Sequence, residues 1–278
     1  MYDKFATLQL IDNWLAEDVG FFDLTAQLMI DPKSTATFYM NAREPMTIAG
    51  IDVAAAVFTR YEPNCKVETR VADGQVVDKG AVLLVVSGPA QALLTAERTA
   101  LNIVQRLSGI ATETAKYVSA ISHTKARLLD TRKTTPGLRM LEKHAATCGG
   151  GLNCRLSLGD GVMLKDNHIA VCGNIAKAVR FAQTKVPTLT KIEVECDRLD
   201  QVREALEAGA DVIMLDNMSI PDMKAAVELV GGRAKLEASG GIRLDTIAAI
   251  AETGVDYIST SRHLQSAPAV DIGLDDKL

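Results

Sequence analysis

The residues with the clearest capacity for chemistry lie in a short polar segment that follows an apolar run. Arg132 and Lys133 come just after the run Ala126–Leu129, with threonine hydroxyls on both sides beginning at Thr131, and they precede a Pro136-Gly137 turn. Arginine binds a planar anion through two parallel hydrogen bonds and lysine adds a point charge, so the segment could hold carboxylates or phosphates. Alone, such a cluster is more often a solvated basic turn, so it indicates an anion site only if other residues join it.

Further basic residues follow in the same pattern. The triplet Gly149-Gly150-Gly151, which permits close backbone approach, leads to Asn153-Cys154-Arg155, and the apolar run Val162–Leu164 ends at Lys165. Like charges about 4 Å apart repel by ~1 to 4 kcal/mol, depending on the local dielectric. Cations that meet at one edge of a sheet therefore indicate a site for a multiply charged anion. The candidates are Arg132, Lys133, Arg155 and Lys165.

Carboxylates follow later apolar runs. Glu195 ends IEVE and Asp216 ends IMLD, so both are expected at the same edge of the sheet as the cations. Such a pair could perform acid/base chemistry or hold Mg²⁺ through oxygen ligands and water, unless one of the two only caps a helix. Ser239-Gly240-Gly241 follows another strand and is expected to open a helix, where backbone N–H groups bind phosphate.

The first part of the chain predicts an α/β sandwich domain over residues 1–110. Leu8–Val19 has the apolar spacing of an amphipathic helix, Thr35–Ala49 that of a pair of strands, and Gly50–Tyr61 is again helical. Lys66–Gly88 consists of short β-runs separated by two glycine-containing turns. We expect the tail, residues 268–278, to return to this domain.

From residue 111 to 267 the pattern predicts parallel β/α units. A helical stretch from Ala90 to Ile121, with an expected break at Ser108-Gly109, leads into six apolar strand-like runs, most of them followed by a helical segment. Asn153–Ser157 is a possible seventh strand, which still falls short of the eight of a complete barrel. We therefore expect an incomplete six- or seven-stranded β/α barrel with polar residues at its C-terminal edge. The six runs are Ala126–Leu129, Val162–Leu164, Ile192–Val194, Val212–Leu215, Ala234–Leu236 and Tyr257–Ile258.

Composition excludes several other classes of protein. The 278 residues carry a net charge of -5, which argues against nucleic-acid binding. No run of apolar residues is long enough to span a bilayer and the N-terminus lacks the plan of a signal peptide, so we expect a cytoplasmic protein. The five cysteines are odd in number and scattered without a paired metal-type spacing, which argues against disulfides and against a zinc site.

Seven sequence blocks together resemble the quinolinate phosphoribosyltransferase family, whose members are also called carboxylating nicotinate-nucleotide pyrophosphorylases. The resemblance implies conversion of quinolinate and phosphoribosyl pyrophosphate to nicotinate mononucleotide, pyrophosphate and carbon dioxide in NAD biosynthesis. It also implies an incomplete barrel, a Mg²⁺ requirement without a prosthetic group, and a homodimer with the active site at the interface. The blocks are Glu97–Thr112, Leu129–Arg139, Glu142–Arg155, Leu164–His168, Ile192–Cys196, Met214–Asn217 and Glu237–Gly241.

The same resemblance implies roles for individual residues. Lys133, Glu195 and Asp216 would be catalytic, and the two acids would also bind the ribose hydroxyls and Mg²⁺. Arg98 would reach the substrate carboxylate of the neighbouring subunit. The residues implied in substrate binding are Arg98, Thr131, Arg132, Lys133, Cys154, Arg155, Lys165, Glu195, Asp216, Ser239, Gly240 and Gly241.

Three positions depart from the family pattern. Cys154 stands where the family usually has a substrate-contacting histidine, Ser259–Arg262 replaces a glycine-containing phosphate loop, and Phe22 replaces a glycine just before Asp23. A thiol is a weak donor without positive charge, which weakens the hold on an anion. Two alternatives stay open: a relative acting on another anionic heterocycle, of the type of the molybdenum-transport-associated paralogue, or a non-catalytic anion-binding protein.

Overall fold

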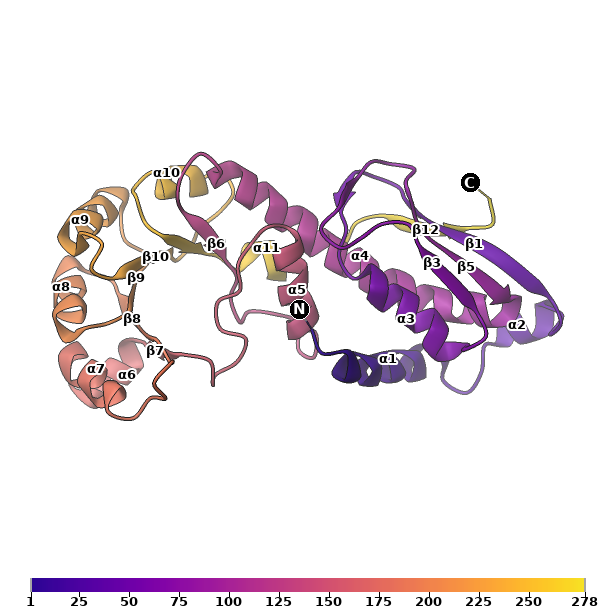
Figure 1. The fold of residues 1–278 in the computed structure, drawn as a ribbon, viewed down its shortest axis with the longest axis horizontal. Coiled ribbons are helices and arrows are strands. Elements are labelled where there is room, and N and C mark those ends of the chain that lie inside the picture. Colours follow the sequence, from indigo (N-terminus) through magenta and orange to yellow (C-terminus); the bar gives the residue numbers. More distant parts are fainter. Residues whose placement is uncertain (1, 278) are drawn as a thin grey trace. The chain divides into compact units, whose positions relative to one another are not determined.

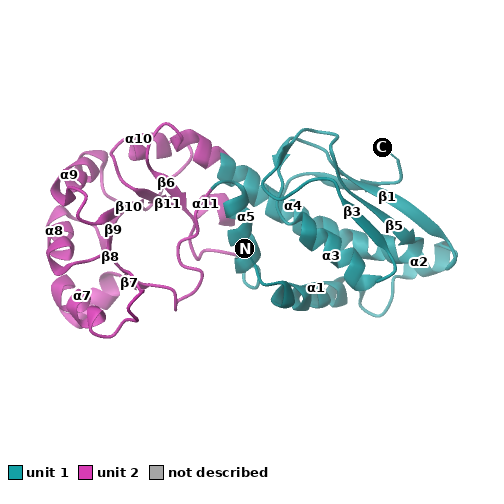
Figure 2. Cartoon of the chain, viewed as in Figure 1, with its two compact units in different colours: residues 1–115, 135–150, 266–278 teal, residues 116–134, 151–265 magenta. Residues whose placement is uncertain are grey.

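A computed structural model describes residues 2–277 and separates into two compact units (Figure 2). Unit 1 holds the described residues up to Ala115, together with Thr135–Gly150 and the chain from Ser266 onward. Unit 2 holds Lys116–Thr134 and Gly151–Gln265. Each unit is therefore assembled from segments that are distant in the sequence, and the segment 135–150 groups with unit 1.

Unit 1 contains a four-stranded antiparallel sheet with the order β12-β1-β5-β3 (Figure 1). The C-terminal strand β12 pairs with β1, and α3 packs on β3 and β5. The segment expected to form a strand pair does contain two strands, but β1 and β2 do not pair with each other, because β1 joins the large sheet and β2 pairs with β4. The elements are α1 (Lys4–Val19), α2 (Leu24–Met29), β1 (Thr35–Ala42), β2 (Met46–Thr47), α3 (Ile51–Tyr61), β3 (Lys66–Thr69), β4 (Val76–Val77), β5 (Val82–Pro89), α5 (Arg139–Cys148) and β12 (Ile272–Asp275).

The long helix α4 (Ala90–Ile121) is continuous, so the predicted break at Ser108-Gly109 is wrong. Both residues are explained by packing instead. The Ser108 hydroxyl is fully buried and exchanges hydrogen bonds with the backbone N–H and C=O of Ala49. A Cβ on Gly109 would lie 2.0 Å from the Pro268 carbonyl oxygen, so glycine is needed there for close approach of another chain segment rather than for a turn.

Unit 2 is an open sheet of six parallel strands with the order β6-β11-β10-β9-β8-β7. The edge strands β6 and β7 are not paired with each other among the described residues, and this confirms the incomplete barrel. Helices α7 to α10 lie along the outer side of the curved sheet (Figure 1). The elements are β6 (Arg127–Leu129), β7 (Val162–Leu164), α6 (Asp166–Cys172), α7 (Ile175–Gln183), β8 (Ile192–Cys196), α8 (Leu199–Ala208), β9 (Val212–Asp216), α9 (Ile220–Val230), β10 (Lys235–Ser239), α10 (Ile247–Ala251), β11 (Tyr257–Ser259) and α11 (Arg262–Gln265).

The possible seventh strand at Asn153–Ser157 is absent from the structure. Leu152 makes an isolated bridge to Leu129, and the chain then leaves the sheet. The reason is the buried carboxylate of Asp130, which accepts hydrogen bonds from the Asn153 side chain at 2.7 Å and from the backbone N–H of Cys154 at 2.8 Å. A backbone donor committed to a side chain cannot serve a sheet ladder.

The core of unit 2 lies between the sheet and its outer helices. Val194, Ile213, Leu215 and Ile258 on the strands are buried, as are helix residues such as Val202. The apolar residues at alternate positions of β8 and β9 therefore face the helices, and the intervening positions face the other side of the sheet. Within residues 2–277, no helix combines the length and apolar character that crossing a bilayer requires.

Candidate active site

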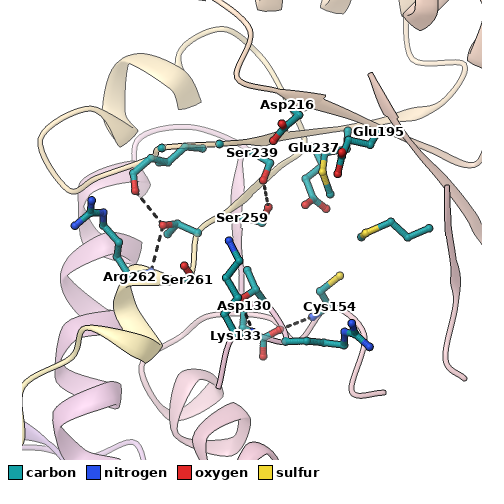
Figure 3. Close-up of a pocket in the computed structure, with 18 of the residues that line it drawn as sticks. Asp130, Lys133, Cys154, Glu195, Asp216, Glu237, Ser239, Ser259, Ser261 and Arg262 are labelled. Carbon is teal, nitrogen blue, oxygen red and sulfur yellow. Dashed lines mark hydrogen bonds between the residues drawn. The ribbon is translucent and has the colours of Figure 1, made fainter. Parts of the chain in front are cut away.

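A cavity of about 710 Å³ lies at the carboxyl ends of the unit 2 strands (Figure 3). Its lining residues all belong to unit 2, and most of them lie in the carboxyl-terminal part of strands β6 to β11 or in the segments that follow these strands. The carboxyl ends of parallel strands meet at one edge of a sheet, which is why polar residues from distant segments gather there.

Nearly all of the predicted site residues line this cavity. They are Thr131, Arg132, Lys133, Cys154, Arg155, Lys165, Glu195, Asp216, Ser239, Gly240 and Gly241. Arg98 does not line it and is exposed on α4 in unit 1. The structure therefore brings the four cations and both carboxylates together, while the role of Arg98 stays a prediction.

The loop after β6 carries Lys133, which points into the cavity (Figure 3). The loop turns back on itself, because the backbone N–H of Lys133 donates to the Thr131 hydroxyl at 3.1 Å. Two residues later, Thr135 donates its backbone N–H and its hydroxyl to the carboxylate of Glu142, which is fully buried. Glu142 also accepts two hydrogen bonds from Arg106.

Carboxylates partly balance the cations of the cavity. Lys165 forms an ion pair with Glu195, and the Asp216 carboxylate accepts a hydrogen bond from the Asn217 side chain at 2.7 Å. The cluster is thus mixed in sign rather than purely cationic, and its internal repulsion is smaller than the sequence alone suggested. The Lys165 side chain is 46% exposed, so it can exchange this partner for a ligand.

Two further acids, Glu193 and Glu237, were missed by the sequence reading. Both are buried, and one oxygen of Glu193, Oε1, has no hydrogen-bond partner among the described residues. Burial is the main reason that the pKa of each carboxyl is raised, and for Glu237 the charge of Glu193 adds to it. The signal was available: side chains alternate along a strand, so Glu193 shares a face with Glu195, and Glu237 shares one with Ser239.

The loops after β10 and β11 form another part of the wall. Gly240 and Gly241 have φ values of 92° and 63°, and a Cβ on Gly240 would lie 2.3 Å from Asn217 Oδ1. Ser239 and Ser259 hydroxyls are 3.1 Å apart, and Ser261 and Arg262 also line the cavity. The expected helix does not start at the glycines, since α10 begins only at Ile247. A phosphate beside the glycines would therefore meet loop N–H groups, whereas the loop after β11 leads directly into α11, whose first residue is Arg262.

Comparison with known proteins identifies this arrangement. Residues 23–108 match the N-terminal domain of quinolinate phosphoribosyl transferase, and residues 110–275 match its C-terminal domain. The chain belongs to the quinolinate phosphoribosyltransferase family.

Individual relatives of the quinolinate phosphoribosyltransferase family match over nearly the whole chain. The nicotinate-nucleotide pyrophosphorylase [carboxylating] of Mycobacterium leprae is 43% identical over 276 residues, 97% of each chain. A probable enzyme of the same name from Synechocystis is 42% identical and covers 95% of this chain and 90% of its own length. The solved nicotinate-nucleotide pyrophosphorylase of Francisella tularensis has a TM-score of 0.96 at 41% identity, covering 99% of this chain and 97% of its own.

The three departures from the family pattern lie in different environments. Cys154 lines the cavity, and burial together with Glu237 and Glu193 raises the pKa of its thiol to about 11, so the thiol is neutral. Ser261 and Arg262 place side chains at the wall. Phe21 and Phe22 are exposed between α1 and α2 in unit 1, and neither lines the cavity. Two of the departures therefore concern the cavity directly.

Proposed function

We propose that this chain is a quinolinate phosphoribosyltransferase that converts quinolinate and phosphoribosyl pyrophosphate to nicotinate mononucleotide, pyrophosphate and carbon dioxide. The observation that carries the proposal is the single cavity lined by Lys133, Arg155 and Lys165 together with Glu195 and Asp216. Both substrates are multiply charged anions, and one of them develops positive charge at a ribose carbon during reaction. A cavity with both signs of charge suits that combination.

Four cations of the cavity, Arg132, Lys133, Arg155 and Lys165, are the groups that we assign to the two carboxylates of quinolinate. Each charge-assisted hydrogen bond in such a site contributes about 1.5 to 3 kcal/mol. The loops that contain Gly240 and Arg262 are assigned to the 5-phosphate, for which the glycines offer backbone N–H groups and Arg262 a planar cation. In this assignment the Arg262 side chain binds the phosphate that, in the family pattern, a glycine-containing loop binds through its backbone.

Glu195 and Asp216 are assigned to the ribose hydroxyls and to Mg²⁺. Their carboxylate oxygens line the cavity and are the hard ligands that Mg²⁺ accepts alongside water. When bound, Mg²⁺ would neutralise charge on the pyrophosphate group. The two carboxylates themselves stabilise the positive charge that develops on the anomeric carbon as its bond to pyrophosphate breaks.

The reaction then needs little covalent chemistry from the protein. The quinolinate ring nitrogen forms a bond to the anomeric carbon as the bond to pyrophosphate breaks, and the ring nitrogen becomes positive. The adjacent carboxylate leaves as carbon dioxide, its electron pair stays on the ring carbon, and that carbon then takes a proton. Lys133 and the arginines hold the reactants in line, which is the main source of rate enhancement in such a displacement.

We further propose that the enzyme is a cytoplasmic homodimer in which Arg98 acts at the partner's site. Arg98 is exposed on α4 and is not needed for the cavity wall of its own unit 2. An exposed arginine on a regular helix can be presented to a second copy without refolding. This assignment is independent of the roles given to the cavity residues.

The test is formation of nicotinate mononucleotide and carbon dioxide by the purified protein, beside Lys133→Ala and the control Lys177→Ala. Lys177 is exposed on α7 and lies outside the cavity. Lys133→Ala should lower kcat/KM by roughly a hundredfold or more, as for loss of one charge-stabilising group, while Lys177→Ala stays at the parent rate. Quinolinate binding without turnover in the parent protein would reject the proposal in favour of an anion-binding protein or another heterocycle.

A further inference from the structure

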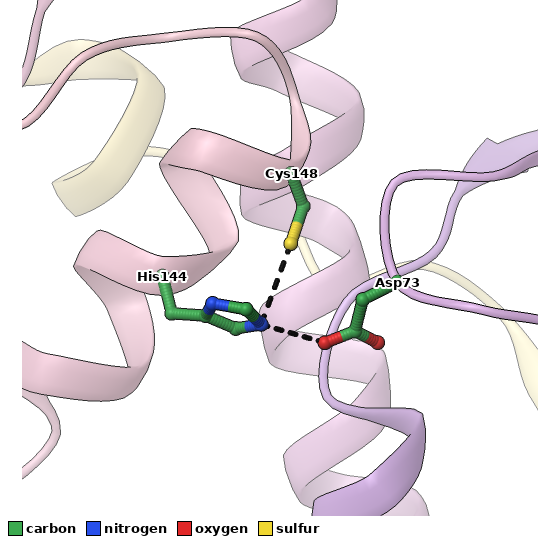
Figure 4. A group of neighbouring side chains, drawn as sticks. All are labelled: Asp73, His144 and Cys148. Atoms are coloured by element: carbon green, nitrogen blue, oxygen red, sulfur yellow. Dashed lines mark hydrogen bonds and ion pairs between the residues drawn. The ribbon is translucent and has the colours of Figure 1, made fainter. Parts of the chain in front are cut away.

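A second group of reactive side chains lies in unit 1, apart from the residues that line the cavity. Asp73, His144 and Cys148 place one ligand atom each within 4.8 Å of the other two (Figure 4). All three are partly buried, and none of them lines the active-site cavity. The proposed transferase chemistry uses none of these side chains.

The fold holds the three residues in fixed places. His144 and Cys148 are four residues apart on α5, which puts them on one face of the helix. Asp73 comes from the turn between β3 and β4, where Gly74 has a φ of 86° and packs near the Cys148 carbonyl oxygen. The other oxygen of Asp73 accepts a hydrogen bond from the backbone N–H of Ile51 at 3.1 Å, so its carboxylate is anchored to the start of α3.

The aspartate and the cysteine both contact the same nitrogen of the histidine ring, unlike the partners in a catalytic triad. A single ring atom, His144 Nε2, lies 2.6 Å from Asp73 Oδ2 and 3.5 Å from Cys148 Sγ. In a nucleophile–histidine–acid triad the two partners would contact opposite ring nitrogens, which is not the case here. Three different ligand atoms that face one point are instead the pattern of a metal site.

The distances can be compared with those of bound zinc. Tetrahedral angles and bond lengths of about 2.0 to 2.3 Å place nitrogen and sulfur ligands about 3.6 Å apart, and nitrogen and oxygen ligands about 3.4 Å apart. The nitrogen–sulfur separation of 3.5 Å already fits. The nitrogen–oxygen pair, at 2.6 Å, would open by about 0.8 Å, which a change in side-chain torsion of Asp73 can supply.

The surroundings of the cluster favour a cation. Two acidic residues, Asp73 and Asp52, lie close to Tyr2 at the edge of the cluster. Tyr2 packs edge-on against the His144 ring, with centroids 4.9 Å apart, and so covers the histidine. Without a metal, burial and Asp73 raise the pKa of the Cys148 thiol to about 12, but a bound divalent cation deprotonates a coordinating thiol.

We propose that Asp73, His144 and Cys148 form a zinc site that joins α5 to the β3–β4 turn. The mixed sulfur, nitrogen and oxygen ligand set matches Zn²⁺, and a fourth position is left for water. Binding would stabilise unit 1, because a ligand that binds only the folded state raises the melting temperature. The site shares no residue with the proposed Mg²⁺ ligands, and the inference does not depend on the proposed function.

The full chain is first stripped of metal with EDTA and then kept in excess Mg²⁺, which occupies sites made only of oxygen ligands. Its affinity for Zn²⁺ is then measured by competition with a chromophoric chelator. Co²⁺ substitution reports the ligand type, since a thiolate ligand gives a charge-transfer band in the near ultraviolet. The parent should bind about one Zn²⁺ per chain with that band, and Cys148→Ser should lose the band and weaken binding roughly a hundredfold or more. His144→Asn is a second variant with the same expected result.

Two controls keep the outcome specific. Cys172→Ser removes a partly exposed thiol outside the cluster and should bind as the parent does. Cys154→Ser tests the other candidate group, in which Cys154 converges with Glu193 and Glu237, and it should also leave zinc binding unchanged. The proposal is overturned if the parent does not bind Zn²⁺, or if Cys154→Ser abolishes binding while a folded Cys148→Ser retains it.

Discussion

Replacing Cys154 by histidine should strengthen quinolinate binding. The thiol lines the cavity beside Glu193 and Glu237, and burial keeps it neutral at physiological pH. An imidazole at the same position would stand near those two carboxyls, and an ionised carboxylate of the pair favours the protonated form of the imidazole. The cavity would then gain one cation and one strong donor for an anionic ligand.

The size of the effect follows from the type of interaction gained. A hydrogen bond from a charged donor contributes about 1.5 to 3 kcal/mol, and 1.4 kcal/mol corresponds to a tenfold change in affinity. The buried carboxyls of Glu193 and Glu237 would compete with quinolinate for the imidazolium. We therefore expect a gain near the lower end of the range of about 1.5 to 3 kcal/mol, that is, about 1.5 to 2 kcal/mol. The dissociation constant for quinolinate should therefore fall by roughly ten- to thirtyfold.

The assay is calorimetric titration with quinolinate, repeated from pH 6 to pH 8.5, together with KM under steady-state turnover. Because a charged imidazole binds the anion and a neutral one does not, the advantage of Cys154→His should be largest at low pH and fade as the pH rises through the imidazole pKa. Cys154→Ser is the matched control and should show no such pH dependence. A folded Cys154→His that binds quinolinate no better than the parent at any pH would refute the reasoning, because position 154 could not then face the carboxylates.

Three other predictions concern the assembly and the buried acids. Equal amounts of the inactive Arg98→Ala and Lys133→Ala proteins should together regain about a quarter of the parent activity if each site uses Arg98 of the partner. Half of the dimers would then be mixed, and each mixed dimer keeps one intact site of two. No recovery after confirmed subunit exchange would exclude the shared site. Glu142→Ala should lower the free energy of unfolding, measured by urea denaturation, by about 3 to 5 kcal/mol. The reason is that Arg106 and both donors of Thr135 lose their buried partner. A loss below about 1 kcal/mol would contradict this prediction. The raised pKa of Glu237 means that its contribution to stability is present below the ordinary glutamate range and is lost as the pH rises through the folded-state pKa. Glu237→Gln should therefore flatten the fall in melting temperature as the pH rises above the ordinary glutamate range.

The strands and the cavity edge were predictable because local sequence determines them. Each apolar run that was chosen as a strand is one, and the polar residues after the runs line one cavity, as expected for parallel strands. Glu195 and Asp216 illustrate the rule, since each lies at or near the end of its own strand. To predict that Glu195 and Asp216 line one cavity, only the fold class had to be known, and no specific contact.

The misses have a common physical origin, which is that tertiary contacts decided them. Gly109 looked like a helix break but exists to admit the Pro268 carbonyl, a neighbour that the local sequence does not reveal. Asn153 and Cys154 looked like strand but are bound by the Asp130 carboxylate. Glu237 could have been found by counting alternate residues along its strand. The spacing of His144 and Cys148 is a local signal, but Asp73 lies more than seventy positions away and only the fold brings it to them.

The ion pair between Lys165 and Glu195 bears on how the proposed enzyme admits its substrates. The lysine is the more exposed partner, with 46% of its side chain open to solvent against 17% for the glutamate, so the pair lies at the edge of the cavity. Exposed pairs contribute only about 0 to 1 kcal/mol, and a carboxylate of quinolinate that accepts a charge-assisted hydrogen bond from Lys165 can displace Glu195 at little cost. The released Glu195 carboxylate would then be available to the ribose hydroxyls, the role that we propose for it. Binding of one substrate would in this way prepare the acidic group that the other requires, without any movement of the strands that carry the two residues.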